Sequence, residues 1–248
     1  LQKNGYDVII ADNLVNSSLE VLDGIEKITG IRPEFEEIDL TDGEVTRDFF
    51  ARHSDIRAVI HFAALKAVGE SVSKPLEYYF NNLNSLMNVL TCMREFKVPN
   101  LVFSSSCTVY GQADVLPVTE KTPRHEAESP YGNTKVMSED IIRDLMRVEP
   151  DMKALALRYF NPIGAHPTAF IGELPNGVPN NLIPYLTQTA IGIREQLSVF
   201  GDDYNTPDGS PLRDYIDVVD LAQAHVVAIR RLLDGKNKKN YEFFNIGT

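Results

Sequence analysis

The stretch RAVIHFAAL, residues 57–65, is a short apolar run rich in residues that favour β-strands. Such a run is typical of a strand buried on both faces of a sheet. Four comparable runs lie before and after it in the chain: DVIIADN (7–13), FEEIDL (35–40), NLVFSSS (100–106) and KALALRYF (153–160). The five runs together predict five buried strands.

Helical patterns separate these runs. Residues 42–52 follow a Thr-Asp start, residues 75–96 form a long mixed segment, and residues 131–148 place apolar side chains at the 3.6-residue period of a helix. Alternation of strands and helices predicts an α/β protein with a Rossmann-like, doubly wound parallel sheet covered by helices on both faces.

The amino-acid composition of the chain changes after residue 160. Residues 161–215 are rich in Pro, Gly and Asn, and we expect them to be too irregular for further sheet. Two helices are expected beyond the strands, over 182–194 and 218–233. We therefore interpret 1–160 as the sheet-bearing domain and 161–248 mainly as a smaller, loop-rich lobe that is interleaved with the sheet.

Composition excludes several classes of function. The net charge of −11, without a basic cluster, argues against nucleic-acid binding. No apolar run approaches the ~20 residues that span a bilayer, so we expect no membrane segment. The two cysteines, Cys92 and Cys107, have no metal-binding spacing, so we expect no metal and free thiols in a reducing compartment, the cytoplasm.

Both ends of the chain look truncated. The chain begins with LQKNG, which resembles the end of a helix, and stops after the apolar run YEFFNIG. The glycine-rich fingerprint G-x-G-x-x-G is absent, although it normally follows the first strand of a dinucleotide-binding fold. We expect this loop upstream of Leu1, and we assign the function to a longer parent protein, because the truncated chain could be inactive.

The carboxyl ends of the predicted strands carry candidate cofactor-binding residues, since doubly wound sheets bind ligands at that edge. Asp12 ends the first predicted strand, where a carboxylate bonds the ribose hydroxyls of NAD and disfavours the phosphate of NADP. Taken alone, Asp12 is more ordinarily interpreted as a turn or helix-capping residue. The small residues Ala63 and Ala64 allow close approach of a cofactor, whereas His61 is interpreted as a core histidine.

A second group of polar residues follows the fourth strand. Three serines, residues 104–106, end that strand, and SPYGNTK (129–135) opens the next helix with Tyr131 and Lys135 four residues apart. On a helix these two side chains share one face, and we expect the ammonium to lower the pKa of the phenol. A surface pair at a helix start is the ordinary alternative, but convergence with the serines favours a proton-abstraction site.

Seven segments in the same order carry a family resemblance: VIIADNLVNS, VIHFAALKAVGESVSKPLEYYFNN, VFSSSCTVYG, SPYGNTK, RYFNPIGAHP, GVPNNLIPY and RDYIDVVDLA. With them the chain resembles the extended short-chain dehydrogenase/reductase family, most closely its UDP-galactose 4-epimerases. The resemblance implies NAD-dependent interconversion of UDP-galactose and UDP-glucose, an isomerase reaction of galactose metabolism, through a transient 4-keto sugar. It also implies a homodimer formed through the helices at 81–96 and 131–148.

The resemblance implies a role for each matching residue. Catalysis would fall to Ser106, Tyr131 and Lys135, with Tyr131 as the base. The residues expected to contact NAD are Asp12, Asn13, Asn16, Asp39, Leu40, Phe62, Ala63, Ala64, Lys66, Asn81, Ser104, Tyr131, Lys135 and Tyr159. The residues expected to contact the UDP-sugar are Lys66, Ser106, Tyr131, Phe160, Asn161, Asn181, Leu182, Phe200, Arg213 and Tyr215. Ala64 departs slightly from the pattern, because some relatives carry Gly there.

Two alternative functions remain open at this point. A sugar-nucleotide 4,6-dehydratase or decarboxylase also oxidises the sugar first, but the family's dehydratases carry an Asp-Glu pair where this chain has Cys107 and Thr108. A non-catalytic NAD-binding regulator would have no need of Tyr131 and Lys135. Outside the resemblance, Arg213 is equally a surface ion-pairing residue and Asn161 an ordinary turn residue.

Overall fold

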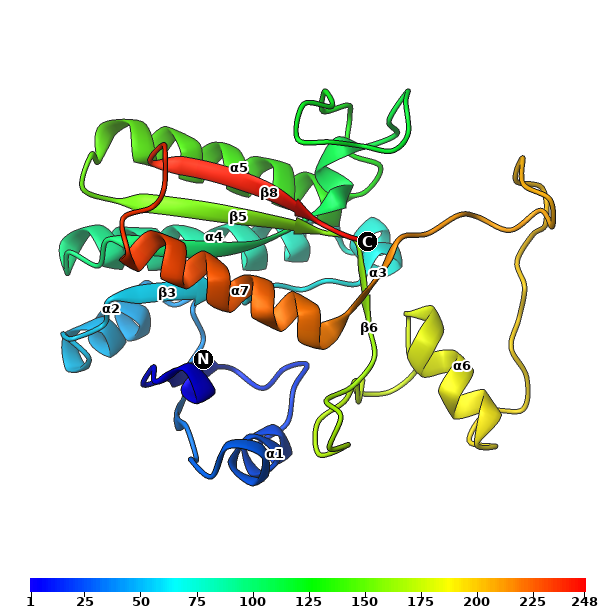
Figure 1. Ribbon diagram of the computed structural model, residues 1–248, viewed down its shortest axis with the longest axis horizontal. Coiled ribbons are helices and arrows are strands. Elements are labelled where there is room, and N and C mark those ends of the chain that lie inside the picture. The colour runs from blue at the N-terminus through cyan, green and yellow to red at the C-terminus, as the bar shows by residue number, and fades with distance from the viewer.

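The computed structural model describes residues 1–248 and has the predicted α/β architecture, built on parallel sheets (Figure 1). The main sheet has the strand order β3-β4-β5-β8, with all neighbours parallel. Its strands are β3 (Ala58–His61), β4 (Asn100–Ser106), β5 (Lys153–Tyr159) and β8 (Tyr241–Ile246). Two further parallel pairs are formed by β1 (Ile9–Asp12) with β2 (Glu34–Glu37) and by β6 (Asn161–Ile163) with β7 (Tyr215–Asp217).

Seven α-helices connect or flank these strands, and local sequence accounts for several of their starts. They are α1 (Glu20–Thr29), α2 (Gly43–Arg52), α3 (Val68–Ser73), α4 (Pro75–Glu95), α5 (Pro130–Val148), α6 (Leu182–Ala190) and α7 (Val218–Leu233). The Asp42 carboxylate caps α2 by accepting from the backbone N–H groups of Glu44 and Val45. The Ser129 hydroxyl caps α5 in the same way, and Pro130 occupies its first turn.

Helices cover both faces of the main sheet, as predicted. Side chains alternate along each strand, so successive residues belong to different cores. Leu101 and Phe103 join the core shared with α2, α4 and α5, whereas Val102 packs against α7. In Figure 1 the helix α7 lies in front of the strands, with α4 and α5 behind them. The edge at which β4 and β5 end is the one that carries the serines and Tyr159.

Three features differ from the sequence prediction. The segment 161–215 does contain sheet, because β6 lies within it and β7 begins at its last residue. These strands are only three residues long, and neither has an apolar run that could reveal it. Helix α6 ends at Ala190 rather than near residue 194, since the backbone turns at Gly192 with a φ of +80°. The elements α1, α3 and β8 were not predicted.

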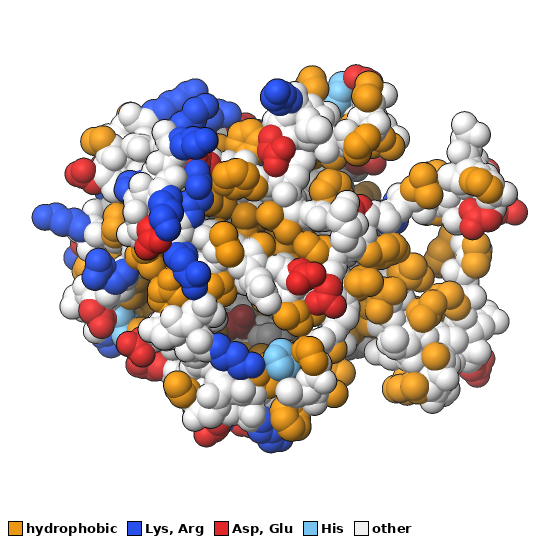
Figure 2. Space-filling view, viewed as in Figure 1, with side chains coloured by type: hydrophobic (Ala, Val, Ile, Leu, Met, Phe, Trp, Pro, Cys, Tyr) orange, Lys and Arg blue, Asp and Glu red, His pale blue; other side chains and the backbone are white.

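The segment that includes α6 stands away from the sheet layers (Figure 1). Figure 2 shows hydrophobic side chains gathered over this part of the molecule. They include exposed residues of α6 and of the chain that follows it, namely Leu182, Leu186, Ile191, Ile193 and Leu197. The division into a sheet domain and a substrate lobe stays a prediction. No helix has both the length and the apolar character that crossing a membrane requires.

Candidate active site

Serine, tyrosine and lysine side chains meet at the carboxyl end of β4. The buried Lys135 ammonium donates a 2.8 Å hydrogen bond to the Ser104 carbonyl oxygen. Its Nζ lies 5.8 Å from the centroid of the Tyr131 ring and 5.0 Å from that of Phe103. The spacing of four residues therefore places Tyr131 and Lys135 on one face of α5, as expected.

Burial dominates the protonation chemistry of Tyr131. It raises the pKa of the phenol, and the nearby Ser106 hydroxyl opposes that rise without overcoming it. The prediction that this pKa is lowered is wrong for this structure, because burial outweighs the favourable effect of the Lys135 charge on the phenolate. The ammonium is directed to the Ser104 carbonyl oxygen, while the phenol is withdrawn from water.

The same burial acts in the opposite sense on the nearby bases. It lowers the pKa of Lys135 to about 8, and the carboxylate of Glu139 works against this fall. It also lowers the pKa of His61 to about 3, with the charge of Lys135 adding to the effect. His61 is thus a buried, neutral residue whose ring stacks on Phe103 at a centroid distance of 6.1 Å, which agrees with its interpretation as a core histidine.

With Tyr159, four hydroxyl groups form a cluster, called the hydroxyl cluster below: those of Ser104, Ser106, Tyr131 and Tyr159. Tyr159 ends β5 in register with Ser106, and its hydroxyl forms a short hydrogen bond with the Ser104 hydroxyl. Burial raises the pKa of Tyr159, and its charge when ionised would raise that of Tyr131. The arrangement can therefore exchange a proton with an alcohol placed among these groups, with one lysine supplying positive charge.

A pocket opens beside this cluster, between the ends of β1, β2 and β3 and the helix α4. Its lining includes eight of the residues predicted to contact a cofactor: Asp12, Asn13, Asn16, Asp39, Leu40, Ala63, Ala64 and Asn81. Oδ1 of Asp12 accepts from the Leu14 N–H and the Ser17 hydroxyl, both at 2.7 Å, whereas Oδ2 has no partner in the chain. The free oxygen suits the hydroxyl groups of a ribose.

Two predicted cofactor residues, Phe62 and Lys66, belong neither to this pocket nor to the hydroxyl cluster with its lysine. The Phe62 ring is 55% exposed and packs against His225 at a centroid distance of 4.7 Å. Lys66 is exposed, with its Nζ 3.9 Å from Oε1 of Glu173. The same Oε1 accepts from Nδ2 of Asn181 at 2.8 Å. Glu173, which the sequence did not single out, thus brings together Lys66 and Asn181, two of the predicted substrate residues.

The remaining predicted substrate residues divide into two groups. Asn161 donates from its backbone and from Nδ2 to the Asp214 carbonyl oxygen, and it pairs in register with Tyr215. Phe160 directly precedes Asn161, and Arg213 lies two residues before Tyr215. Four candidates therefore lie at the β6–β7 pair, and the Arg213 guanidinium is exposed. The other group consists of Leu182 and Phe200, which are 50% and 100% exposed, away from the hydroxyl cluster.

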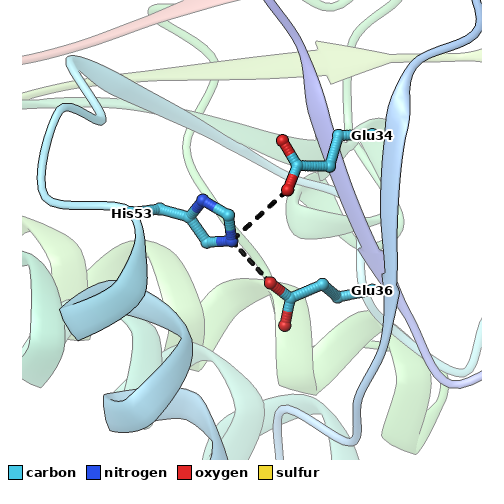
Figure 3. Close-up of side chains that lie close together, drawn as sticks. All are labelled: Glu34, Glu36 and His53. Carbon is cyan, nitrogen blue, oxygen red and sulfur yellow. Dashed lines mark hydrogen bonds and ion pairs between the residues drawn. The ribbon is translucent and has the colours of Figure 1, made fainter.

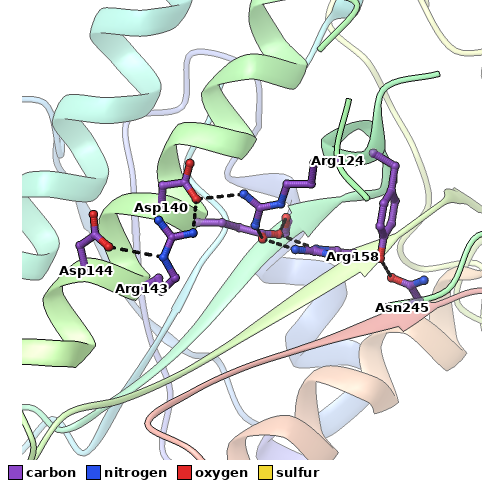
Figure 4. A network of polar contacts seen from close by, with 9 residues as sticks. Arg124, Asp140, Arg143, Asp144, Arg158 and Asn245 are labelled. Carbon is purple, nitrogen blue, oxygen red and sulfur yellow. Dashed lines mark hydrogen bonds and ion pairs between the residues drawn. The ribbon is translucent and has the colours of Figure 1, made fainter. Parts of the chain in front are cut away.

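A buried polar network beneath the hydroxyl cluster was not predicted. Glu139 of α5 accepts from Ser105, Arg158 and Arg124, and the Tyr110 hydroxyl links Arg158 to Asn245 (Figure 4). Its members are spread over five segments of the chain. The only sequence signal was the acidic residue one helical turn after Lys135.

One group of side chains has metal-ligand chemistry. Glu34, Glu36 and His53 lie together at the amino end of β2, with His53 Nε2 at 2.5 Å from Glu36 and 4.0 Å from Glu34 (Figure 3). The guanidinium of Arg52 also pairs with Glu36. We interpret these residues as a polar cluster near the surface, at the amino ends of the strands, whereas the hydroxyl groups lie at the carboxyl ends.

The model of the NAD dependent epimerase/dehydratase family matches residues 1–247. The chain belongs to this family. Among the family's proteins, UDP-glucose 4-epimerase of Bacillus subtilis is 50% identical over 248 residues, which are the whole of this chain and 72% of that protein. UDP-glucose 4-epimerase of Mus musculus is 49% identical over 254 residues, again 100% of this chain and 72% of the relative.

Solved structures of family members share the fold over its full extent. The crystal structure of UDP-glucose 4-epimerase from Bifidobacterium longum, in complex with NAD⁺ and UDP, aligns with a TM-score of 0.95 at 46% identity. The alignment covers 100% of this chain and 72% of the Bifidobacterium longum chain. The predicted family membership and fold are confirmed.

Proposed function

We propose that this protein is an NAD-dependent UDP-glucose 4-epimerase that interconverts UDP-galactose and UDP-glucose. The observation that carries the proposal is the convergence of Ser106, Tyr131 and Lys135 at the end of β4, beside a pocket headed by Asp12. Relatives about 50% identical over the whole chain bear this name. The reaction belongs to galactose metabolism.

The residues of the pocket fit the adenosine half of NAD. Oδ2 of Asp12 would accept from the ribose hydroxyls, with Asn13 and Asn16 beside it, while Asp39 and Leu40 would flank the adenine. The carboxylate also repels a 2′-phosphate, which favours NAD over NADP. Bound NAD⁺ would supply the acceptor and donor of the hydride, together with a positively charged ring.

Tyr131 would act as the proton carrier of the reaction. Its phenolate would take the proton of the sugar C4 hydroxyl as the C4–H bond gives up its hydride, which leaves a 4-keto sugar. After the keto sugar turns over within the site, the hydride would return to the other face of C4 and Tyr131 would return the proton to the C4 oxygen. Ser106, whose hydroxyl lies near the Tyr131 phenol, would hold the sugar hydroxyl in line with the phenol. Lys135 would supply the cation that makes the phenolate accessible, and Tyr159 would close the cluster.

The UDP-sugar would lie along the edge formed by β6, β7 and the start of α6. Asn161 and Tyr215 are held together by the β6–β7 pairing, and the exposed guanidinium of Arg213 suits the oxyanions of a pyrophosphate. Lys66 and Asn181, joined through Glu173, would contact the substrate from the other side. We retain Phe160, Leu182 and Phe200 as candidates on the resemblance alone.

The dehydratase alternative is disfavoured by the residues that follow Ser106. Elimination of water needs a further acid and base, and the family's dehydratases carry Asp-Glu there. In this chain Cys107 and Thr108 occupy these positions, and burial raises the pKa of the Cys107 thiol. A neutral thiol and a hydroxyl are poor replacements for two carboxyl groups.

We further propose a homodimer and a cytoplasmic location. A mainly apolar groove between α4 and α5 supports a helical dimer interface; it is lined by Met87, Leu90, Ile141 and Leu145, together with Thr91 and Arg94. The cytoplasmic assignment is supported by the free thiols of both cysteines.

The test is turnover of UDP-galactose by the full-length protein, purified without added NAD, with Tyr131→Phe alongside. We expect UDP-glucose to form, and the variant to lose roughly 10²–10⁴-fold in rate while keeping its fold. A 4-keto-6-deoxy product would point to a dehydratase, and release of CO2 from a UDP-hexuronic acid, without turnover of UDP-galactose, would point to a decarboxylase. Bound NAD without any product would point to a regulator.

A further inference from the structure

The carboxylate of Glu139 is fully buried and fully occupied (Figure 4). Its Oε1 accepts from the Ser105 hydroxyl at 2.6 Å and from Nε of Arg158 at 2.8 Å. Its Oε2 accepts from a second nitrogen of Arg158 at 2.5 Å and from the guanidinium of Arg124. A carboxylate has about four acceptor positions, so the protein satisfies all of them.

The strand residues that hold Glu139 alternate with site residues. Ser105 lies between Ser104 and Ser106 on β4, and Arg158 directly precedes Tyr159 on β5. Ser105 and Arg158 are also partners in the register of the two strands. Because neighbouring side chains of a strand point to opposite faces, any shift of Ser105 or Arg158 also moves the hydroxyl groups on the other face.

Glu139 itself extends the face of α5 that carries the chemistry. It lies four residues after Lys135 and eight after Tyr131, so the three side chains succeed one another along one side of the helix. A buried ion pair is weak evidence for stability, since apolar residues of similar volume often serve as well. Its position along this face points to a role in the site instead.

We propose that Glu139, clamped by Ser105 and by two arginines, is a positioning residue that seats α5 on the ends of β4 and β5 and provides the counter-charge of the Lys135 ammonium. The inference rests on the proposed function for its effect on the reaction, because Lys135 must be cationic to favour the Tyr131 phenolate. Loss of the Glu139 charge would make Lys135 release its proton at lower pH.

Several titratable or polar groups face Lys135 besides Glu139. They are the Tyr131 phenol on α5, His61 on β3, the Ser104 carbonyl on β4, and Tyr159 on β5. Burial keeps His61 uncharged across the working range of pH, and Tyr159 is neutral there because burial raises its pKa. Glu139 is therefore the negative charge that acts on Lys135 in this range, and the guanidinium groups of Arg158 and Arg124 that pair with it offset part of that charge.

The test compares three variants of the full-length protein. Glu139→Gln removes the charge while keeping the shape, Arg124→Gln removes one positive charge from the clamp, and Arg147→Gln is the matched control. Arg147 is an exposed residue of the same helix that pairs with Asp144 and contacts neither Glu139 nor Arg124. Two quantities are measured: the titration of Lys135 by NMR, assigned with Lys135→Met, and the alkaline limb of kcat/KM for UDP-galactose.

We expect Glu139→Gln to move both the Lys135 titration and the alkaline limb to lower pH, by on the order of one unit. Arg124→Gln should move them to higher pH by less, because Arg124 is partly exposed, and Arg147→Gln should move neither. If Glu139 had only a structural role, Glu139→Gln would lower the melting temperature and leave both the Lys135 titration and the alkaline limb unchanged. That result would overturn the proposal.

Two outcomes separate this inference from the proposed function. If Glu139→Gln fails to fold, the upward shift in Arg124→Gln decides, and its absence overturns the proposal. If the wild-type protein turns over no UDP-galactose, the proposed function fails, while the NMR titration of Lys135 still tests the counter-charge.

Discussion

Tyr131 and Lys135 are buried side by side, and burial shifts the pKa values of the two groups in opposite directions. The pKa of the phenol rises and that of the ammonium falls, so the low-dielectric surroundings favour the uncharged form of each. As the pH rises, Lys135 therefore loses its proton before Tyr131 does. A cation must remain near the phenol for proton abstraction, which is why the charge of Glu139 matters at this site.

His61 provides a residue-scale prediction about stability. Its pKa is about 3 in the folded protein and close to 6.5 in the unfolded chain, so the unfolded state binds more protons between these values. Stability should therefore fall as the pH drops below 6.5. The loss attributable to His61 is about 2 kcal/mol at pH 5, from about 1.4 kcal/mol per unit.

The measurement compares urea unfolding of the wild type and of His61→Phe at pH 7 and pH 5. Phe keeps the stacking on Phe103 and cannot be protonated. The variant should lose about 2 kcal/mol less than the wild type over this interval. Parallel losses in the two proteins would show that His61 is not held uncharged.

At the scale of elements, Gly24 seats α1 against the loop at residues 170–171. A methyl group on Gly24 would lie 2.6 Å from the side chain of Ile171 and 2.7 Å from the carbonyl oxygen of Phe170. Gly24→Ala should therefore destabilise the protein by about 1–3 kcal/mol despite the better helix propensity of Ala.

Gly69 in α3 is the matched control for this prediction, because a methyl group there would meet nothing within 4 Å. Gly69→Ala should be neutral or stabilising by up to about 1 kcal/mol in chemical denaturation. Equal effects of the two substitutions would contradict the packing of α1 against the loop.

The elements that could be predicted from the sequence are those whose pattern is long or strongly apolar. β4 and α7 have the bounds that their sequence patterns predict. By contrast, β6 and β7 are three residues each and are stabilised by pairing with a distant segment, which no local pattern shows. The pocket residues were predictable because they follow strands, whereas the Glu139–Arg158 contact joins a helix to a strand and depends on packing.

At the scale of the whole molecule, the groove between α4 and α5 leads to a prediction about assembly. Met87 on its rim is 42% exposed in the single chain, so its replacement should not disturb the core. In sedimentation velocity the wild type should be a dimer, and Met87→Asp should be a monomer because a charge in an apolar interface is left without a partner. Val227 is an exposed residue on the outer side of α7, so the Val227→Asp variant should stay dimeric. A monomeric wild type would contradict the proposed interface.

The central claim is that the sugar is oxidised at C4 and reduced again within one site. Its most direct test is to give the full-length protein UDP-galactose that carries deuterium at C4, in ordinary water. The account predicts UDP-glucose with the deuterium still at C4, because the hydride leaves and returns without meeting solvent. Loss of the label to water, or a product that is not UDP-glucose, would contradict it.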